Sequence, residues 1–98
     1  NVYCSEVETA LYNHPDVAEC SVFSVPDERL GEEVGAAIFP NPGTQPSAQD
    51  LREFCKTQLA AYKAPRYIWI LDEPLPRNAS GKFAKRTLQE SLDLAKAG

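Results

Sequence analysis

The tract PLPRNASGKFAKR, residues 74–86, gathers the cations whose spacing could do chemistry in this sequence. Gly81 and Lys82 stand at the expected start of a helix that Ser80 would cap. The start of a helix carries a partial positive charge, so a lysine there is unfavourable unless it faces an anion. Three more cations lie in the same tract: Arg77, Lys85 and Arg86. We therefore predict that Lys82 contacts a phosphate or a carboxylate, with an exposed lysine on a polar loop as the alternative.

The Gly-Lys pair does not form a Walker phosphate-binding loop. That motif requires glycine at position 76 and serine or threonine at position 83, where this sequence has Pro76 and Phe83. The other cations of the tract either add to the positive field or are solvated. For Lys85 and Arg86 we expect solvation.

The charge of the chain is divided unevenly between its halves. The 98 residues carry a formal net charge of -4, yet residues 1–50 hold one cation, Arg29, and nine acidic residues. Residues 51–98 hold nine cations and five acidic residues. The cations are too few and too scattered for a nucleic-acid interface, so a small phosphate-bearing ligand fits better. No apolar run approaches the roughly 18 residues that a membrane span needs, so we expect no span.

Three cysteines and one histidine offer little for metal chemistry. Cys4, Cys20 and Cys55 form no C-x-x-C pair and His14 is the only histidine, so we expect no metal site. Reduced thiols without a signal peptide indicate a cytoplasmic protein. His14 invites a general-base role, but its place before Pro15 favours capping or surface packing. Because the sequence contains no Met, we expect it to be a piece of a longer chain.

Apolar periodicity predicts six secondary-structure elements in an α+β fold. The first is a helix that begins with a Ser5–Glu8 capping box and ends at His14-Pro15. Strands follow at 17–25 and 34–39, then a helix that starts near Ser47 and a strand at 67–71. The last is a helix from Ser80 with Leu88, Leu92 and Ala95 on one face. The first two strands are close enough in sequence to pair as antiparallel neighbours. We expect a small sheet of about three strands flanked by helices, in which Tyr67 and Trp69 pack.

Five short motifs, in order and across nearly the whole chain, carry a resemblance to a known family. They are Asn1-Val2-Tyr3 leading to Glu6-Val7-Glu8, His14-Pro15-x-Val17, Val25-Pro26-Asp27 with Gly31-Glu32, Tyr62-Lys63-x-Pro65, and Leu75-Pro76-Arg77 with Gly81-Lys82. Together they resemble the C-terminal domain of the adenylate-forming superfamily, which includes acyl-CoA synthetases, firefly luciferase and peptide-synthetase adenylation domains. Cys4 departs from the proline usual at that position.

The resemblance implies that residues 1–98 are the mobile lid of a larger enzyme. In that family a large N-terminal domain binds ATP and a carboxylic acid, and this small domain closes over them. The hinge and the N-terminal domain would lie outside this chain, so the isolated chain is expected to be inactive. The resemblance maps the family's catalytic lysine onto Lys82, with Pro76, Arg77 and Gly81 as its supporting loop. It also implies substrate and coenzyme A contacts for Gly31, Glu32, Tyr62, Lys63 and Arg66. Structural alternatives are that Tyr62 fills the core and that Pro65 only ends a helix.

The implied enzyme is an ATP-dependent, AMP-forming acyl-CoA synthetase. It would activate a carboxylic acid, most like a fatty or aryl acid, as an acyl-adenylate and transfer the acyl group to coenzyme A. ATP with Mg²⁺ would be bound mainly by the N-terminal domain, which is the first expected partner. A lysine acetyltransferase and deacetylase acting on Lys82 are further expected partners, because acetylation removes its charge, and mass spectrometry of the native protein can test this.

Three other functions remain open at this point. The acyl group could pass to a carrier protein instead of coenzyme A. The chain could be a stand-alone nucleotide-binding or anion-binding regulatory module. An RNA-binding sheet using Phe39, Tyr67 and Trp69 is disfavoured, because the sequence is acidic and lacks the signature of such sheets. The sequence does not determine which acid is used, since the missing domain would select it.

Overall fold

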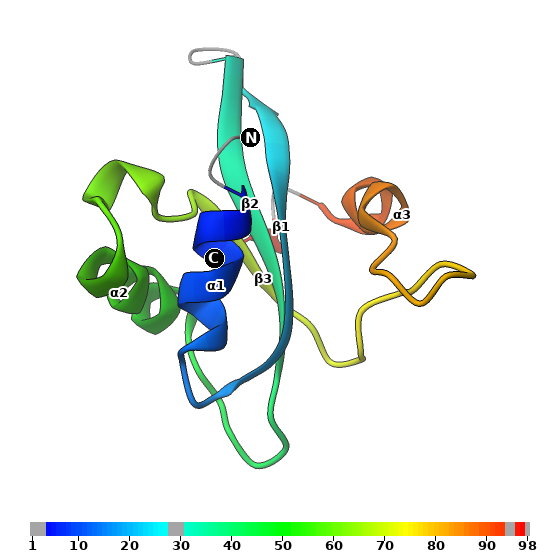
Figure 1. Ribbon diagram of the computed structural model, residues 1–98, viewed down its shortest axis with the longest axis horizontal. Helices are drawn as coiled ribbons and strands as arrows, with labels where there is room; N and C mark the ends of the chain where they lie inside the picture. The colour runs from blue at the N-terminus through cyan, green and yellow to red at the C-terminus, as the bar shows by residue number, and fades with distance from the viewer. Residues whose placement is uncertain (1–3, 28–30, 94–95, 98) are drawn as a thin grey trace.

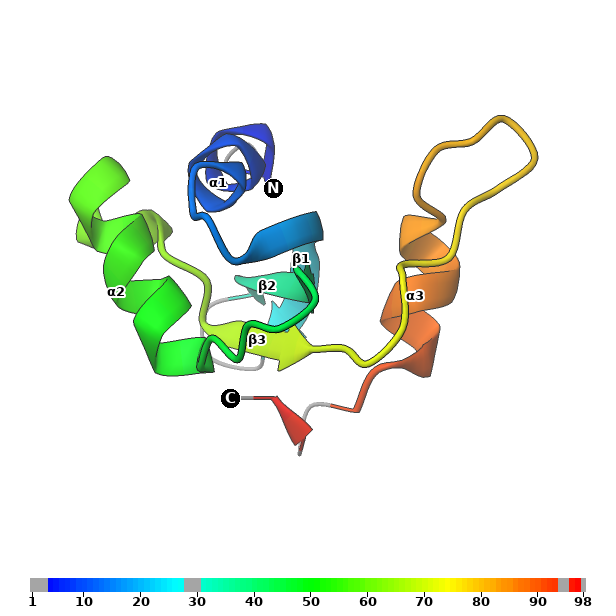
Figure 2. The same ribbon diagram turned by 90° about the horizontal axis from the view of Figure 1, so that it is seen from below.

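A three-stranded sheet with helices on both faces forms the molecule (Figures 1 and 2). The computed structural model describes residues 4–27, 31–93 and 96–97. The elements are α1 (Cys4–Tyr12), β1 (Val17–Asp27), β2 (Gly31–Pro40), α2 (Ala48–Gln58), the 3-10 turn η1 (Ala61–Lys63), β3 (Tyr67–Ile70) and α3 (Lys85–Ser91). The strand order is β1-β2-β3, with β2 antiparallel to β1 and parallel to β3. The predictions of an α+β fold of about three strands, with the first two antiparallel, are confirmed.

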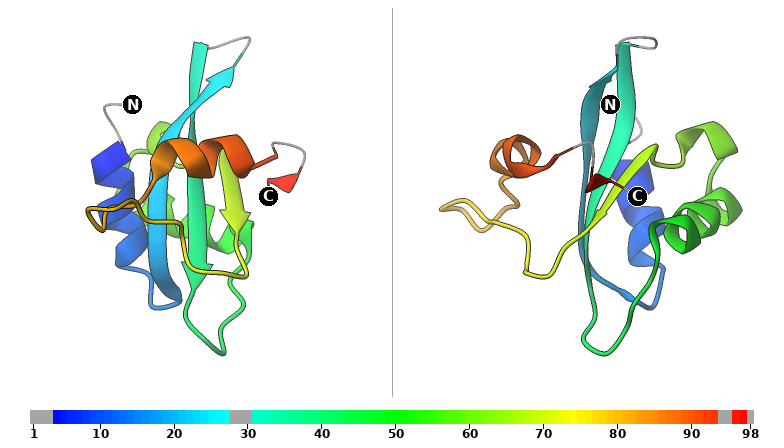
Figure 3. Two further views of the ribbon diagram at one scale, coloured as in Figure 1. Left: turned by 90° about the vertical axis from the view of Figure 1, so that its right-hand side faces the viewer. Right: turned by 180° about the vertical axis from the view of Figure 1, so that it is seen from behind.

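The two faces of the sheet bury different side chains, because successive residues of a strand point to opposite sides. Cys20 and Val22 of β1 pack with α1 and α2, whereas Phe23 and Val25 pack on the face that α3 covers (Figure 3). On this second face Trp69 is buried, stacks on Phe23, and donates its indole N–H to the carbonyl oxygen of Asp93 at 2.9 Å. The expected packing of Trp69 within the sheet is therefore confirmed.

Strands β1 and β2 are longer than predicted, because their ladder continues past the apolar residues. Backbone pairing extends to Asp27 opposite Gly31. Gly31 and Glu32 thus begin β2 instead of lying in a polar connection, and both are exposed. Because Gly31 and Glu32 are not apolar, no local pattern predicted a strand at this place.

The capping box predicted at the start of the first helix is wrong. Helix α1 already includes Cys4, so Ser5 lies inside it, and the Ser5 carbonyl oxygen accepts a hydrogen bond from the Thr9 hydroxyl at 3.0 Å. The Glu8 carboxylate reaches away from the helix to the backbone N–H of Val22, at 2.8 Å. Glu8 therefore bonds strand β1 instead of capping the start of its own helix. The Asn1-Val2-Tyr3 motif lies outside the described residues.

The prediction that Ser80 caps the last helix is also wrong. Helix α3 begins at Lys85, and its N-cap, Ala84, makes no side-chain hydrogen bond. Phe83 instead pairs with Arg77 in an isolated β-bridge, which keeps the chain extended until just before the helix. Leu88 is buried within α3, Leu92 is its C-cap, and Ala95 lies outside the described residues. Lys82 is therefore not in a helix, and the argument from the charge of a helix start does not apply to it.

Candidate functional site

The segment from Pro76 to Ala84 forms a short hairpin that presents Lys82 near its tip. The backbone N–H of Asn78 donates to the Lys82 carbonyl oxygen at 2.8 Å, and the Lys82 N–H donates to the Asn78 side-chain oxygen at 3.2 Å. Gly81 closes the turn with a φ of +83°, a left-handed conformation that favours glycine. The Ala84 N–H then donates to the Pro76 carbonyl oxygen at 2.9 Å and closes the base of the hairpin. The backbone on both sides of Lys82 is thus held by hydrogen bonds.

Arg77 ties this hairpin to itself and to the sheet. Its guanidinium donates to the Gly81 carbonyl oxygen at 2.8 Å and lies 4.4 Å from the centre of the Phe83 ring. It also pairs with the Glu19 carboxylate of β1 at 3.2 Å. The other Glu19 oxygen accepts the backbone N–H of Leu75 at 2.9 Å. Arg77 therefore joins the two arms of the hairpin to each other and to strand β1.

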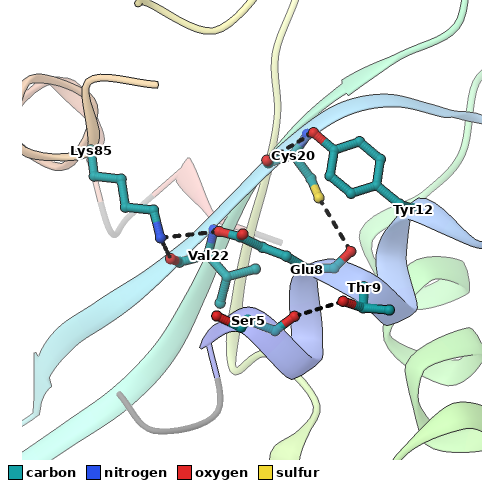
Figure 4. Close-up of polar contacts among 7 residues, drawn as sticks. All are labelled: Ser5, Glu8, Thr9, Tyr12, Cys20, Val22 and Lys85. Atoms are coloured by element: carbon teal, nitrogen blue, oxygen red, sulfur yellow. Dashed lines mark hydrogen bonds and ion pairs between the residues drawn. The ribbon is translucent and has the colours of Figure 1, made fainter. Parts of the chain in front are cut away.

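The Lys82 ammonium is exposed and makes no hydrogen bond or ion pair with any residue of the described part of the chain. Its neighbour Lys85 differs, because it pairs with Glu8 at 3.0 Å and donates to the Val22 carbonyl oxygen at 2.8 Å (Figure 4). The expectation that Lys85 is merely solvated is wrong. Arg86 is exposed, as expected. Among neighbouring cations of one tract, the tertiary structure therefore engages Lys85 and leaves Lys82 to the solvent.

A second group of predicted residues lies around η1, on the opposite side of the sheet from the Lys82 hairpin (Figures 1 and 2). Tyr62 is 71% exposed, so the alternative that it fills the core is wrong. Lys63 pairs with Glu6 of α1 at 3.0 Å. The Arg66 guanidinium lies 5.1 Å from the centre of the Tyr67 ring. The Lys63 ammonium also lies 5.9 Å from the centre of the Tyr62 ring, so the structure brings Tyr62 and Lys63 together, whereas Arg66 lies against Tyr67.

Arg52 of α2 fixes the backbone of that segment. It donates to the carbonyl oxygens of Pro65 at 2.9 Å and Arg66 at 3.2 Å. The Arg66 N–H donates to the Val34 carbonyl oxygen at 2.8 Å, which begins the pairing of β3 with β2. Pro65 itself is fully buried, after α2 has already ended at Gln58. The exposed Tyr62 and Arg66 therefore lie on a segment whose backbone is fixed by hydrogen bonds.

Glu8, Glu19 and Arg52 are site-building residues that sequence reasoning missed. Each bonds a residue at least 13 positions away in the chain. No local motif marks Glu19 or Arg52, and the motifs that contain Glu8 indicated a helix cap and not this contact. One available signal was the uneven charge of the two halves. The ion pairs Glu6–Lys63, Glu8–Lys85 and Glu19–Arg77 each join an acid of the first half to a cation of the second.

The cysteines and the histidine have structural surroundings. Burial raises the pKa of the Cys20 thiol to about 12, with a further contribution from the nearby Glu8 charge, and burial raises the pKa of Cys55 to about 11. Burial also raises the pKa of Cys4. Thiols held in the protonated form are poor nucleophiles. His14 accepts the Asp16 N–H on Nδ1 at 3.1 Å and packs edge-on against Phe54, as expected of a structural residue.

The described residues contain neither a cluster of metal ligands nor a helix that could span a membrane. In residues 4–27, 31–93 and 96–97, no group of three or more His, Cys, Asp or Glu side chains is arranged to hold a metal ion. Over the same ranges, no helix has the length and apolar character needed to cross a membrane.

Comparison with known proteins agrees with this geometry. Residues 6–82 match the family model of the AMP-binding enzyme C-terminal domain. The chain is 44% identical over 85 residues to an oxalate–CoA ligase of Arabidopsis thaliana, a match that covers 87% of this chain and 16% of that protein. It is 48% identical over 91 residues to the fatty acid–[acyl-carrier-protein] ligase ScoC of Streptomyces coeruleorubidus, covering 92% and 17%.

A solved structure with the same fold is that of an acyl-CoA synthetase from Brucella canis. The TM-score is 0.80 at 37% sequence identity, and the match covers 89% of this chain and 16% of that one. The chain thus spans 16 to 17% of the length of the curated relatives described above. By the family match, the sequence identities and the shared fold, this chain belongs to the family of AMP-binding enzyme C-terminal domains.

Proposed function

We propose that this chain is the mobile C-terminal domain of an ATP-dependent, AMP-forming acid:CoA ligase and that Lys82 is its adenylation lysine. The observation that carries the proposal is the state of that side chain. Lys82 stands in a hairpin held by backbone hydrogen bonds, and its ammonium has no partner in the described part of the chain. An unpaired ammonium on a backbone held in place by hydrogen bonds is suited to bind an anionic ligand that another domain carries. The family match ends at this residue.

In the first half-reaction, a carboxylate oxygen attacks the α-phosphorus of ATP and pyrophosphate leaves, giving an acyl-adenylate. Two anions must approach each other while negative charge grows on the phosphoryl oxygens. The Lys82 ammonium would contact both reactants, orient them and offset their repulsion. Phosphoryl transfer depends mainly on such positioning and electrostatics. We expect Mg²⁺ to accompany ATP and to be held by the N-terminal domain, since the described residues offer no cluster of ligands for it.

In the second half-reaction, the thiol of coenzyme A attacks the acyl carbonyl carbon and AMP leaves. We propose that the surface around η1 and the start of β2 serves this step. Tyr62 offers an exposed ring with the Lys63 ammonium 5.9 Å from its centre, and Arg66 adds an exposed cation on the same segment. Such a surface can stack on a base and pair with phosphates. Because it lies on the opposite side from Lys82, a rotation of this domain between the two steps would present each surface in turn (Figure 1).

The acid and the acceptor belong to the proposal as well. We propose a fatty acid and coenzyme A. A second candidate, transfer to a carrier protein, is favoured by the 48% identity to ScoC, whose name specifies an acyl-carrier-protein acceptor. The oxalate–CoA ligase is a relative at similar identity, so relatives of this domain serve chemically different acids.

The test is Lys82→Ala in the full-length enzyme, with each half-reaction assayed separately. We expect acyl-adenylate formation to fall by about 10²-fold or more, because the lost contact acts on the transition state. Supplied acyl-adenylate should still react with coenzyme A. Arg86→Ala is the matched control, since it removes an exposed cation four residues away. Survival of both half-reactions in Lys82→Ala would show that Lys82 is an ordinary surface lysine.

A further inference from the structure

The outer edge of strand β1 is closed by side chains in place of a fourth strand. Tyr12 bonds the Cys20 peptide, accepting its N–H at 3.2 Å and donating to its carbonyl oxygen at 3.3 Å. The Gln89 amide donates to the Ser24 carbonyl oxygen at 2.6 Å. Between Cys20 and Ser24 along the strand, the N–H and the carbonyl oxygen of Val22 are also hydrogen-bonded by side chains. An open strand edge would otherwise leave these groups to solvent or to another chain.

The Val22 peptide is held by two opposite charges at once. The Glu8 carboxylate of α1 accepts its N–H at 2.8 Å, and the Lys85 ammonium of α3 donates to its carbonyl oxygen at 2.8 Å. The same Glu8 oxygen lies 3.0 Å from the Lys85 nitrogen, so the three groups close a ring of contacts (Figure 4). The Lys85 and Glu8 side chains are 45% and 26% exposed. We call Glu8, Lys85 and the Val22 peptide the edge clasp.

Lys85 of the edge clasp stands three residues after Lys82, at the first residue of α3. Helix α3 is seven residues long and has no side-chain N-cap, so it would be marginal by itself. Leu88 is its buried residue. At the other end of the hairpin, Arg77 is fixed to Glu19 of the same strand. The Lys82 hairpin is therefore attached to β1 on both sides, through Glu19 before the tip and through the edge clasp after it.

We propose that Lys85 is a positioning residue for Lys82. By binding Glu8 and the Val22 carbonyl oxygen, it fixes the first turn of α3 and so fixes where the hairpin holds the Lys82 ammonium relative to the sheet. This inference rests on the proposed role of Lys82 in adenylation. A displacement of about 1 Å at a reacting group can cost on the order of 10²-fold in rate, so a clasp of this kind acts on the turnover rate.

The experiment compares Lys85→Ala, Lys85→Arg and Arg86→Ala in the full-length enzyme, with Lys82→Ala in parallel. Hydrogen exchange is measured for peptides covering residues 76–84, and both half-reactions are assayed. In Lys85→Ala we expect faster exchange at 76–84 and a fall of about tenfold or more in kcat for adenylation, with KM for ATP and thiolysis of supplied acyl-adenylate near wild type. Lys85→Arg should restore most of both. Arg86→Ala should change neither, because it removes a neighbouring cation that is exposed.

Unchanged exchange at 76–84 in Lys85→Ala would overturn the proposal. So would faster exchange with a normal adenylation rate while Lys82→Ala is inactive, or an equal loss of rate in Arg86→Ala. If Lys82→Ala keeps full adenylation, the proposed function fails, and exchange at 76–84 alone decides whether Lys85 holds the hairpin. If Lys85→Ala unfolds the domain, Glu8→Gln takes its place, because the amide oxygen can still accept the Val22 N–H while the ion pair is lost.

Discussion

Lys82 depends on its neighbour Gly81 for the direction in which it leaves the hairpin. The φ of Gly81 is +83°, and a Cβ built at this position would meet no atom within 4 Å. Glycine is therefore favoured at position 81 because of its left-handed backbone conformation, and not because a side chain would lack space. Asn78 completes the turn, since its side-chain oxygen accepts the N–H groups of Ser80 at 3.0 Å and of Lys82 at 3.2 Å.

We expect Gly81→Ala to destabilise the hairpin by about 1 kcal/mol, because a Cβ disfavours the left-handed backbone. Gly81→Asn should cost less, since asparagine tolerates that conformation better than alanine. Hydrogen exchange at 76–84 in the full-length enzyme measures both, together with the adenylation rate. Equal effects of alanine and asparagine would contradict a conformational cause.

At the scale of elements, β1 organises the molecule. One of its faces packs with α1 and α2, the other with α3, and its outer edge binds Tyr12, Glu8, Lys85 and Gln89. The hydroxyl of Ser21, also in β1, is buried and has no hydrogen-bond partner in the described part of the chain. No contact in the structure explains this group.

The layer between the helices and the sheet should protect Cys20 and Cys55 from alkylation. Their pKa values are raised by burial to about 12 and about 11, from an ordinary value of 9.0. The folded state therefore keeps both thiols protonated. The stability linked to this is complete below pH 9 and is lost as the pH rises through about 11 and 12, because only the unfolded chain ionises readily.

We expect iodoacetamide at pH 8 to modify Cys4, which is half-buried, faster than Cys20 or Cys55 in the full-length enzyme. Mass spectrometry of the three peptides gives the rates, and denatured protein, in which the thiols should react alike, is the control. Modification of Cys20 as fast as Cys4 would show that the layer opens easily.

Over the whole molecule, the uneven charge of the sequence is partly used within the fold. Within the described residues, the ion pairs Glu6–Lys63, Glu19–Arg77 and Glu8–Lys85 connect the acidic half to the basic half, where the sequence had suggested only an external anion. Exposed ion pairs contribute about 0–1 kcal/mol each, so these pairs fix positions more than they add stability. Lys82 is an exposed cation that takes no part in these ion pairs.

If ATP is held mainly by the N-terminal domain, as proposed, this domain should bind ATP weakly when isolated. We expect the 98-residue chain, checked for folding by circular dichroism, to bind ATP with a Kd of about 1 mM or weaker. Titration calorimetry measures this, with the Lys82→Ala chain as control. Binding at about 10 μM or tighter would favour the stand-alone nucleotide-binding module, and tight binding of a short RNA would contradict the ligase proposal.

The sequence by itself determined the class of fold and singled out Lys82 as the candidate adenylation lysine. Helix and strand periods are local, so α1, α2 and the three strands could be predicted from apolar spacing, and the Gly81-Lys82 motif stood out within its family context. Boundaries that lack an apolar signal, at Gly31 and at the start of α3, were missed.

Only the tertiary structure decided that Arg77 and Lys85 are engaged and that Lys82 faces solvent. Arg77 meets Glu19 across 58 residues of sequence, and Lys85 meets Val22 across 63. No pattern of nearby residues encodes such contacts, because they form only when the strands and helices pack. Lys82 and Lys85 look alike in the sequence. The fold separates them, since the ammonium of one reaches the edge of β1 and that of the other faces solvent.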